Sequence, residues 1–302
     1  MSIIGLDEAT VTADDLAVAR QFLVDYGLQE VESTEAGFVF HAQDGTGLRV
    51  RHTSDTTLPP AVAAGPNIRQ AIWGVDQPET LDAIAANLSR DRAVERRDGL
   101  VLSTDDDGLS IAFRVTQRKP LVTKPSLVNV PGQPPQRPAN AVPDFDQQVR
   151  PLTFSHLVLF TPDMPRIEAF YQRLGFRVTD RLTGSGVFMR AEGNSDHHQL
   201  FFVHRPAVAE KGLHHIAFHV KDHTEVMLAG MAFAGKGWET LWGPGRHVFG
   251  ANHFWYFNSP FGGKIEFDAD MDVVDDNWSP REAAPGPKSA AVWATQYLPN
   301  KK

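Results

Sequence analysis

The sequence contains no cysteine among its 302 residues. This absence excludes disulfide bonds, thiolate nucleophiles, and zinc or iron–sulfur sites with cysteine ligands. Basic residues are in the minority, with 29 Lys and Arg against 37 Asp and Glu and a formal net charge of −8. Because no basic surface dominates such a chain, we expect no nucleic-acid partner.

Long apolar runs are missing as well. No stretch approaches the roughly 20 apolar residues that a membrane-spanning helix needs. The N-terminal segment MSIIGLDEATVTADD lacks the basic and then apolar order of a secretory signal peptide. Glycine-rich phosphate-binding motifs and a Gly-x-Ser-x-Gly turn are also absent, so nucleotide and serine-hydrolase chemistry have no support. We therefore expect a soluble, cytoplasmic protein with no membrane partner.

Proline marks a boundary in the middle of the chain. Residues 118–150 hold seven prolines and show no helical or strand periodicity, which predicts an extended linker. The linker separates a domain at residues 1–117 from a second domain at 151–270. A tail at 271–302 follows and contains the aromatic residues Trp278, Trp293 and Tyr297. These residues suggest that the tail packs on the body, and a partly ordered extension is the alternative.

The two long segments repeat each other. ATVTADDLAVARQFLVDYGLQEV and LVLFTPDMPRIEAFYQRLGFRVT share a strand-like run, an aspartate and a helical stretch. The aspartates, Asp15 and Asp163, suit helix N-caps. A glycine follows each by 12 residues, Gly27 and Gly175, and suits a helix C-cap.

Further pairs of matching segments extend the repeat to four units of strand, helix and several strands. AIWGVDQPETLDAI matches HIAFHVKDHTEVML, and DDGLSIAF matches PFGGKIEF. This order predicts an α+β fold of two tandem domains. Each domain is expected to hold two βαβββ modules that form a curved, barrel-like mixed sheet.

Histidine is concentrated in the second half, where ten of the twelve lie between His156 and His253. His156, His215 and Glu266 fall in strand-like runs at matching places of the repeat. Each histidine alone would more often be an ordinary hydrogen-bonded residue, so the prediction depends on the set. Two histidines and a carboxylate hold a divalent metal ion and leave one face of it open.

The first half offers an internal comparison for this set. Its corresponding positions are Glu8, Gln70 and approximately Ala112, so the candidate ligands are missing together. We therefore expect one metal site, in the second domain, with the first domain as a scaffold that carries no metal ligands.

The run GPGRHVFGANHFWYFNSPFGGKIEF resembles the signature of the type I extradiol ring-cleaving dioxygenases of the vicinal oxygen chelate, or glyoxalase–bleomycin resistance, superfamily. HHQLFFV at 197–203 and LHHIAF at 213–218 are similar to that family's catalytic-histidine and second ligand strands. The resemblance implies an enzyme that inserts both atoms of O2 into a catechol-type aromatic diol and opens the ring beside its hydroxyls. It also implies a role in aromatic-compound degradation.

Carried over residue by residue, the resemblance implies that His156, His215 and Glu266 bind Fe(II), with Mn(II) as the alternative metal. His198 would be the acid–base residue on the O2 side, with His197 as the fallback. Both assignments agree with general chemistry, because a catechol binds a Lewis-acidic metal as an anion and a nearby histidine accepts its proton.

The same resemblance implies roles for Tyr256, which would hydrogen-bond one catechol oxygen, and for His247, which would bond the other. His214 is expected to face outward. Residues near the motif are candidates for the substrate pocket: Trp242, Phe249, His253 and His197. The aromatic residues among them favour a neutral, apolar substituent on the substrate.

Two other functions stay open at this point. A metal-dependent isomerase or lyase of the glyoxalase type would use the same fold and similar ligands. A metal-free protein that binds aromatic ligands would lack the triad that this chain contains. Family members tend to form homo-oligomers, which we also expect here.

Overall fold

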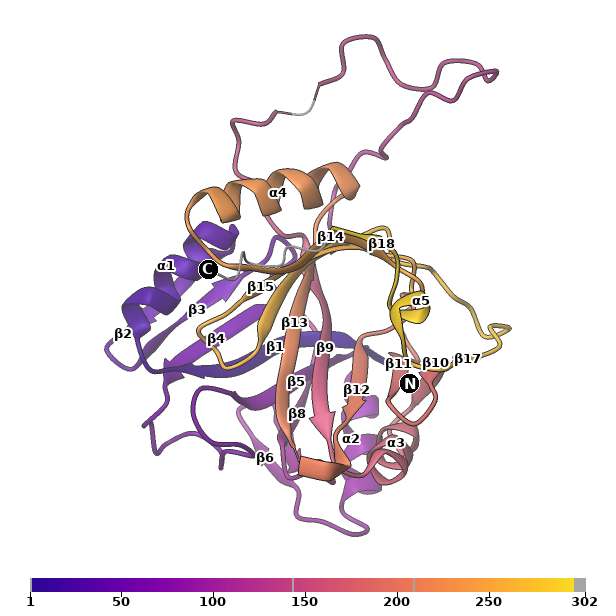
Figure 1. Ribbon diagram of the computed structural model, residues 1–302. Coiled ribbons are helices and arrows are strands. Elements are labelled where there is room, and N and C mark those ends of the chain that lie inside the picture. Colours follow the sequence, from indigo (N-terminus) through magenta and orange to yellow (C-terminus); the bar gives the residue numbers. More distant parts are fainter. Residues whose placement is uncertain (1, 143, 209, 296–302) are drawn as a thin grey trace.

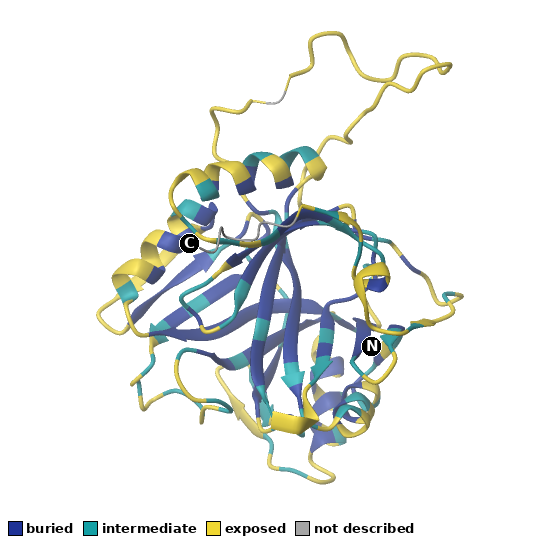
Figure 2. Cartoon of the chain, viewed as in Figure 1, coloured by how far each residue is buried: buried dark blue, intermediate teal, exposed yellow. Residues whose placement is uncertain are grey.

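The computed structural model describes residues 2–142, 144–208 and 210–295, and two mixed β-sheets dominate it (Figure 1). One sheet has eight strands in the order β2-β3-β4-β1-β5-β8-β7-β6. The other has ten strands in the order β17-β10-β11-β12-β9-β13-β16-β15-β14-β18. Figure 2 shows that the strands of both sheets are largely buried, whereas the helices expose one side.

Each half of the chain runs twice through strand, helix and three strands. The first half comprises β1 (Ile3–Ala13), α1 (Leu16–Tyr26), β2 (Gln29–Thr34), β3 (Gly37–His41), β4 (Gly47–His52), β5 (Ile68–Val75), α2 (Pro78–Leu88), β6 (Glu95–Arg97), β7 (Leu100–Thr104) and β8 (Ser110–Val115). The second half comprises β9 (Thr153–Thr161), α3 (Met164–Arg173), β10 (Phe176–Leu182), β11 (Gly186–Ala191), β12 (Leu200–His204), a 3-10 turn (Pro206–Val208), β13 (Gly212–His219), α4 (His223–Gly235), β14 (Thr240–His247), β15 (His253–Asn258) and β16 (Lys264–Ala269). The predicted α+β fold of four βαβββ modules is confirmed.

The repeated aspartates and glycines bound the first helix of each half. Asp15 accepts hydrogen bonds from the backbone N–H groups of Ala17 and Val18, and Asp163 accepts one from Arg166. Gly27 is the C-cap of α1 with φ +97°, a left-handed conformation that costs glycine little. Gly175 has the same φ but follows the C-cap of α3 by one residue.

The C-terminal tail extends both edges of the second sheet. Its strand β17 (Arg281–Ala283) pairs parallel with β10, and β18 (Ala291–Ala294) pairs antiparallel with β14, with α5 (Pro287–Ala290) between them. The indole N–H of Trp278 donates a 2.8 Å hydrogen bond to the carbonyl of Thr179. The expected packing of the tail on the body is therefore seen up to residue 295, and Tyr297 lies outside the described residues.

The proline-rich linker leaves the body and returns to it as an extended excursion (Figure 1). Within its described residues, the segment from 116 to 152 contains no helix or strand. Several of its apolar side chains are exposed, among them Val122 and Phe145. No described helix is long and apolar enough to cross a membrane.

The first half supports the strand of the second half that carries Glu266. Tyr26, at the end of α1, is buried and stacks on Phe267 with ring centroids 3.9 Å apart. Its hydroxyl donates a 2.6 Å hydrogen bond to the backbone carbonyl of Glu266. The two halves also meet at the turn before β16, where a Cβ on Gly262 would lie 1.8 Å from the carbonyl oxygen of Pro66.

We predict that Tyr26→Phe keeps the ring stacking but lowers the free energy of unfolding by about 1–2 kcal/mol, because one buried hydrogen bond is lost. Denaturant unfolding followed by tryptophan fluorescence measures this change. Phe145→Leu, on the exposed linker, is the control and should leave stability unchanged. A Tyr26→Phe protein as stable as the wild type would contradict the role of this contact.

Candidate metal centre and active site

Three neighbouring strands bring the predicted metal ligands together. His156 lies on β9, His215 on β13 and Glu266 on β16, and these strands are adjacent in the second sheet. Ala217 of β13 pairs with both His156 and Glu266, so the small side chain lies between them. All three predicted ligands are buried, and one donor atom from each lies within 4.8 Å of the others.

The donor atoms have the spacing of one face of an octahedron. His156 Nε2 lies 3.1 Å from His215 Nε2 and 3.1 Å from Glu266 Oε2, and His215 Nε2 lies 3.3 Å from the same oxygen. Ligands at right angles with bonds of about 2.1 Å would be about 3 Å apart. Glu266 Oε1 is buried and has no hydrogen-bond partner among the described residues. The set therefore fits a divalent cation.

The charge states of these residues also suit metal binding. Burial lowers the pKa of His215 to about 4, although the Glu266 carboxylate opposes the shift. Burial alone would raise the pKa of Glu266, but the adjacent imidazoles of His156 and His215 hold it well below its usual range. A neutral imidazole and an ionised carboxylate are the forms that coordinate a cation.

Hydrogen bonds behind His156 fix its ring. The Ser155 hydroxyl lies 2.9 Å from His156 Nδ1 and donates a 3.0 Å hydrogen bond to Asp268. Since the hydroxyl proton is directed at the carboxylate, the hydroxyl oxygen accepts from His156 Nδ1–H, which leaves Nε2 with a lone pair. Asp268 also forms an ion pair of 3.0 Å with His219. Such outer contacts orient metal-binding histidines.

His214 does not face outward as expected. The register of β13 with β9 shifts between Leu213 and His215, and this irregularity turns His214 toward the same side as its neighbour. His214 Nδ1 lies 2.7 Å from His215 Nδ1, and the ring lines the cavity beside the triad. Burial lowers the pKa of His214 to about 2, with His215 and Lys264 adding to the effect.

A cavity with a volume of about 310 Å³ opens onto the triad. Most of its wall is apolar, and the side chains that line it include Val158, Leu182, Phe188, Phe201, Leu241, Trp242 and Phe249. The predicted polar groups His198, His247 and Tyr256 line it as well. A concave apolar site with a few polar groups at the reactive centre is the usual form of a small-molecule site.

Tyr256 and His247 form a hydrogen-bonded pair in this cavity. The Tyr256 hydroxyl lies 2.9 Å from His247 Nε2, and His247 Nδ1 lies 3.0 Å from the carbonyl oxygen of Ala290. The carbonyl can only accept, so His247 Nδ1 holds a proton and Tyr256 donates to Nε2. Burial, and then Glu266, raises the pKa of Tyr256 well above its usual value. Tyr256 is therefore a neutral donor.

His198 is buried against the triad, with its ring centroid 4.4 Å from that of His156. Burial lowers the pKa of His198 well below its usual value, and His156 and His197 reinforce the shift. Its neighbour His197 is also buried but lies behind it. The neutral ring of His198 is thus the one that meets the cavity.

Only two of the four residues predicted to line the substrate pocket do so. Trp242 and Phe249 line the cavity, whereas the described lining includes neither His197 nor His253. His197 turns toward Asp180, with 2.7 Å between His197 Nε2 and Asp180 Oδ2. His253 lies against His223, with ring centroids 5.5 Å apart. The sequence also missed Ser289 and Ala290 of the tail, because nothing local signals that this segment returns to the cavity.

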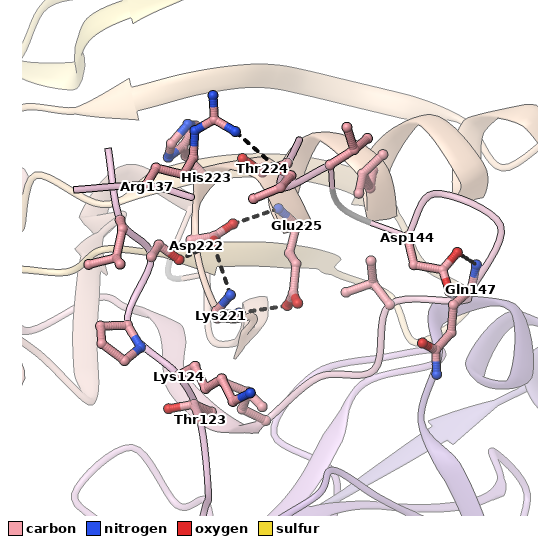
Figure 3. Close-up of a pocket in the computed structure, with 18 of the residues that line it drawn as sticks. Thr123, Lys124, Arg137, Asp144, Gln147, Lys221, Asp222, His223, Thr224 and Glu225 are labelled. Carbon is pink, nitrogen blue, oxygen red and sulfur yellow. Dashed lines mark hydrogen bonds and ion pairs between the residues drawn. The ribbon is translucent and has the colours of Figure 1, made fainter. Parts of the chain in front are cut away.

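A larger cavity, of about 1370 Å³, lies elsewhere, between the linker and the start of α4 (Figure 3). Two of its acidic side chains form hydrogen bonds at the start of α4. Asp222 accepts a 3.0 Å hydrogen bond from the backbone N–H of Glu225, whose carboxylate accepts one from the backbone of Lys221. None of the three predicted metal ligands lines this cavity, so it is separate from the candidate centre.

The first sheet places different residues at the equivalent positions. The pairing registers match, so three residues of the first half occupy the places of His156, His215 and Glu266, namely Glu8, Gln70 and Ala112. Glu8 forms a 3.0 Å ion pair with Arg49, and Gln70 donates a 2.9 Å hydrogen bond to Ser110. In the first sheet these polar side chains therefore pair with neighbouring polar groups. At the equivalent positions of the second sheet, the side chains are the predicted metal ligands.

Comparisons with known proteins agree with this geometry. The family model described as the glyoxalase/bleomycin resistance protein/dioxygenase superfamily matches residues 153–267. Metapyrocatechase 2 from Cupriavidus necator is 31% identical over 271 residues, which are 89% of this chain and 82% of that protein.

Solved structures share the fold over nearly the whole chain. A Mn(II)-bound glyoxalase from Novosphingobium aromaticivorans has a TM-score of 0.76 at 22% identity, covering 97% of this chain and 91% of that chain. The 2,3-dioxygenase LapB from Pseudomonas sp. KL28 has a TM-score of 0.75 at 20% identity, covering 94% and 98%. The chain belongs to the metapyrocatechase-like extradiol dioxygenases of the glyoxalase/bleomycin resistance protein/dioxygenase superfamily.

Proposed function

We propose that this protein is an extradiol dioxygenase that uses O2 to cleave a catechol-type aromatic diol beside its hydroxyl groups. The observation that carries the proposal is the buried set of His156, His215 and Glu266, whose two histidines line an apolar cavity. The relationship to metapyrocatechase 2 of Cupriavidus necator supports it.

We infer that the triad binds Fe(II), with Mn(II) as the alternative. Both ions accept two imidazoles and one carboxylate, so the ligand set does not distinguish them. When bound, the metal would act as a Lewis acid that lowers the pKa of a catechol hydroxyl and would provide open positions for substrate and O2.

The polar side chains of the cavity would handle the protons. Tyr256 is a neutral donor and would hydrogen-bond one catechol oxygen. His247, which already shares a hydrogen bond with Tyr256, would bond the other oxygen. His198 meets the cavity as a neutral ring and would act as the acid–base residue.

The cavity wall favours a substrate with an apolar ring or an apolar substituent. Trp242, Phe249 and Phe188 contribute aromatic surface. Of the lining residues, Lys264 alone carries a fixed charge, and its ammonium group lies 3.4 Å from His214 Nε2. A neutral substituent loses little by leaving water for such a wall, whereas a cationic one would find no anionic partner among these lining residues.

A metal-dependent isomerase or lyase of the glyoxalase type is the second candidate. The observation that favours it is the shared fold with a structure named a Mn(II)-bound glyoxalase. The three extra groups His198, His247 and Tyr256 around the triad favour the dioxygenase instead. A metal-free binding protein would have no use for the converging ligands. A cytoplasmic location and a homo-oligomeric state stay predictions from the sequence.

Anaerobic reconstitution with Fe(II), followed by O2 uptake with a panel of catechols, tests the proposal. Consumption of one O2 per catechol with a yellow ring-opened product is the expected result. Bound metal without O2 uptake on any catechol would favour the isomerase. Failure to bind metal would favour the binding protein.

We predict that His215→Ala lowers affinity for Fe(II) by more than about 100-fold, since even outer contacts of metal ligands are worth 10–100-fold. Metal content after dialysis measures this, and ring cleavage should be lost in parallel. His253→Ala, outside the cavity, is the control. An alanine variant that retains iron and turnover would contradict the assignment of His215.

His198→Phe should keep its iron but lower kcat by about 100- to 10,000-fold, the usual contribution of a positioned acid–base group. Steady-state kinetics together with iron analysis separates the two effects. Wild-type turnover in this variant would remove His198 from proton transfer.

Tyr256→Phe should lower kcat/KM by about 10- to 100-fold, because one hydrogen bond to a charged catechol oxygen is lost. Turnover and anaerobic catechol binding, followed by absorbance, report the loss. If both match those of the wild type, Tyr256 does not contact the substrate.

A further inference from the structure

The ring of His198 is fixed from behind by a second histidine. His198 Nδ1 lies 3.1 Å from His197 Nδ1, so only one of these two nitrogens carries a proton. His197 is fully buried and outside the cavity lining. The tautomer of His198 therefore depends on the protonation of His197.

The hydrogen bond to Asp180 determines which ring nitrogen of His197 carries a proton. His197 Nε2 lies 2.7 Å from Asp180 Oδ2. Burial alone would raise the pKa of Asp180, but hydrogen bonds from His197 and Arg281 outweigh it and hold the pKa below its usual value. The group is thus a carboxylate, which only accepts, so His197 Nε2 carries a proton.

Arg281 of the C-terminal tail is the cation that pairs with the Asp180 carboxylate. Arg281 places Nε 3.1 Å from each carboxylate oxygen and Nη2 2.5 Å from Oδ2, and its backbone N–H donates to Oδ1 at 2.7 Å. The guanidinium also lies over the rings of Phe249 and Trp278, at 5.2 and 4.9 Å. Fork-like arginine–carboxylate contacts of this kind are geometrically specific.

Arg281 already balances the charge of Asp180. Asp180 already has a cation partner, and a second positive charge on the fully buried His197 would be uncompensated. A neutral His197 with a proton on Nε2 has a lone pair on Nδ1. His198 Nδ1 must then be the donor, and His198 Nε2 is left unprotonated.

The same tail segment also fixes His247, a second histidine of the cavity. The carbonyl oxygen of Ala290 lies 3.0 Å from His247 Nδ1, and the opposite nitrogen, Nε2, lies 2.9 Å from the Tyr256 hydroxyl. Two contacts from residues 281–290 therefore set the tautomers of His198 and His247, the two cavity histidines expected to handle protons. Neither contact comes from the repeated βαβββ modules.

We propose that the C-terminal tail is a positioning element of the active site, in which Arg281 acts through Asp180 and His197 to keep His198 protonated on Nδ1 and free to accept a proton on Nε2. The catalytic consequence rests on the proposed function, because it assumes that His198 takes a proton from the substrate. The tautomer itself does not depend on that function.

The experiment compares Asp180→Asn and Arg281→Met with Arg177→Met. Arg177 is a matched control because it lies on the same strand as Asp180, forms an ion pair with Glu192, and has a side chain as exposed as that of Arg281, at 42% and 43%. Two-dimensional NMR of metal-free protein carrying ¹⁵N-labelled histidine reads the tautomer of His198 directly. Iron content, kcat and KM for catechol are measured on the Fe(II)-loaded enzymes.

We expect wild type and Arg177→Met to show His198 with its proton on Nδ1. Asp180→Asn and Arg281→Met should show a mixture of tautomers, with kcat lowered at least tenfold, KM for catechol changed less than threefold, and iron content unchanged. A merely structural role would change KM and iron content together with kcat.

An unchanged His198 tautomer in Asp180→Asn, which is nearly isosteric and should fold, would overturn the proposal even if Arg281→Met proved unstable. Unchanged kcat in both variants would overturn its catalytic part. If the wild type cleaves no catechol while the tautomer shifts as expected, the proposed function fails and the positioning role stands.

Discussion

The structure depends on two imidazole nitrogens and a carboxylate oxygen that are held about 3 Å apart inside a buried sheet. Such a cluster of lone pairs is unfavourable in a low-dielectric interior unless a cation neutralises it. Much of the second half keeps these atoms in place. Adjacent strands set their spacing, Ser155 and Asp268 orient His156, and Tyr26 of the first half holds the backbone at Glu266.

Duplication gives the two halves the same framework but different uses for it. At the positions of the metal ligands, the first sheet has an ion pair between Glu8 and Arg49 and an amide–hydroxyl hydrogen bond. These polar groups satisfy one another, so the first sheet does not need a metal. It contributes packing, because α1 lies against α4 and β16 of the second half. The second sheet, with its edges extended by the tail, surrounds the cavity.

The sequence was sufficient to predict the parts of this protein that repeat or follow strand periodicity. Matching segments predicted four βαβββ modules, and equal positions in the repeat predicted that His156, His215 and Glu266 would meet. The orientation of His214 could not be predicted, because it depends on a register shift that no local pattern marks. His253 follows the motif in sequence but turns toward α4, and the contact of Arg281 with Asp180 joins residues 101 apart. Such contacts arise only when the whole sheet has formed.

The most direct measurement of the central claim is an anomalous diffraction map of crystals grown anaerobically with Fe(II). We expect one strong iron peak at about 2.0–2.3 Å from His156 Nε2, His215 Nε2 and a Glu266 oxygen, on the side of the triad that faces the cavity. An iron peak elsewhere, or none at the triad in crystals soaked with excess Fe(II), would contradict it.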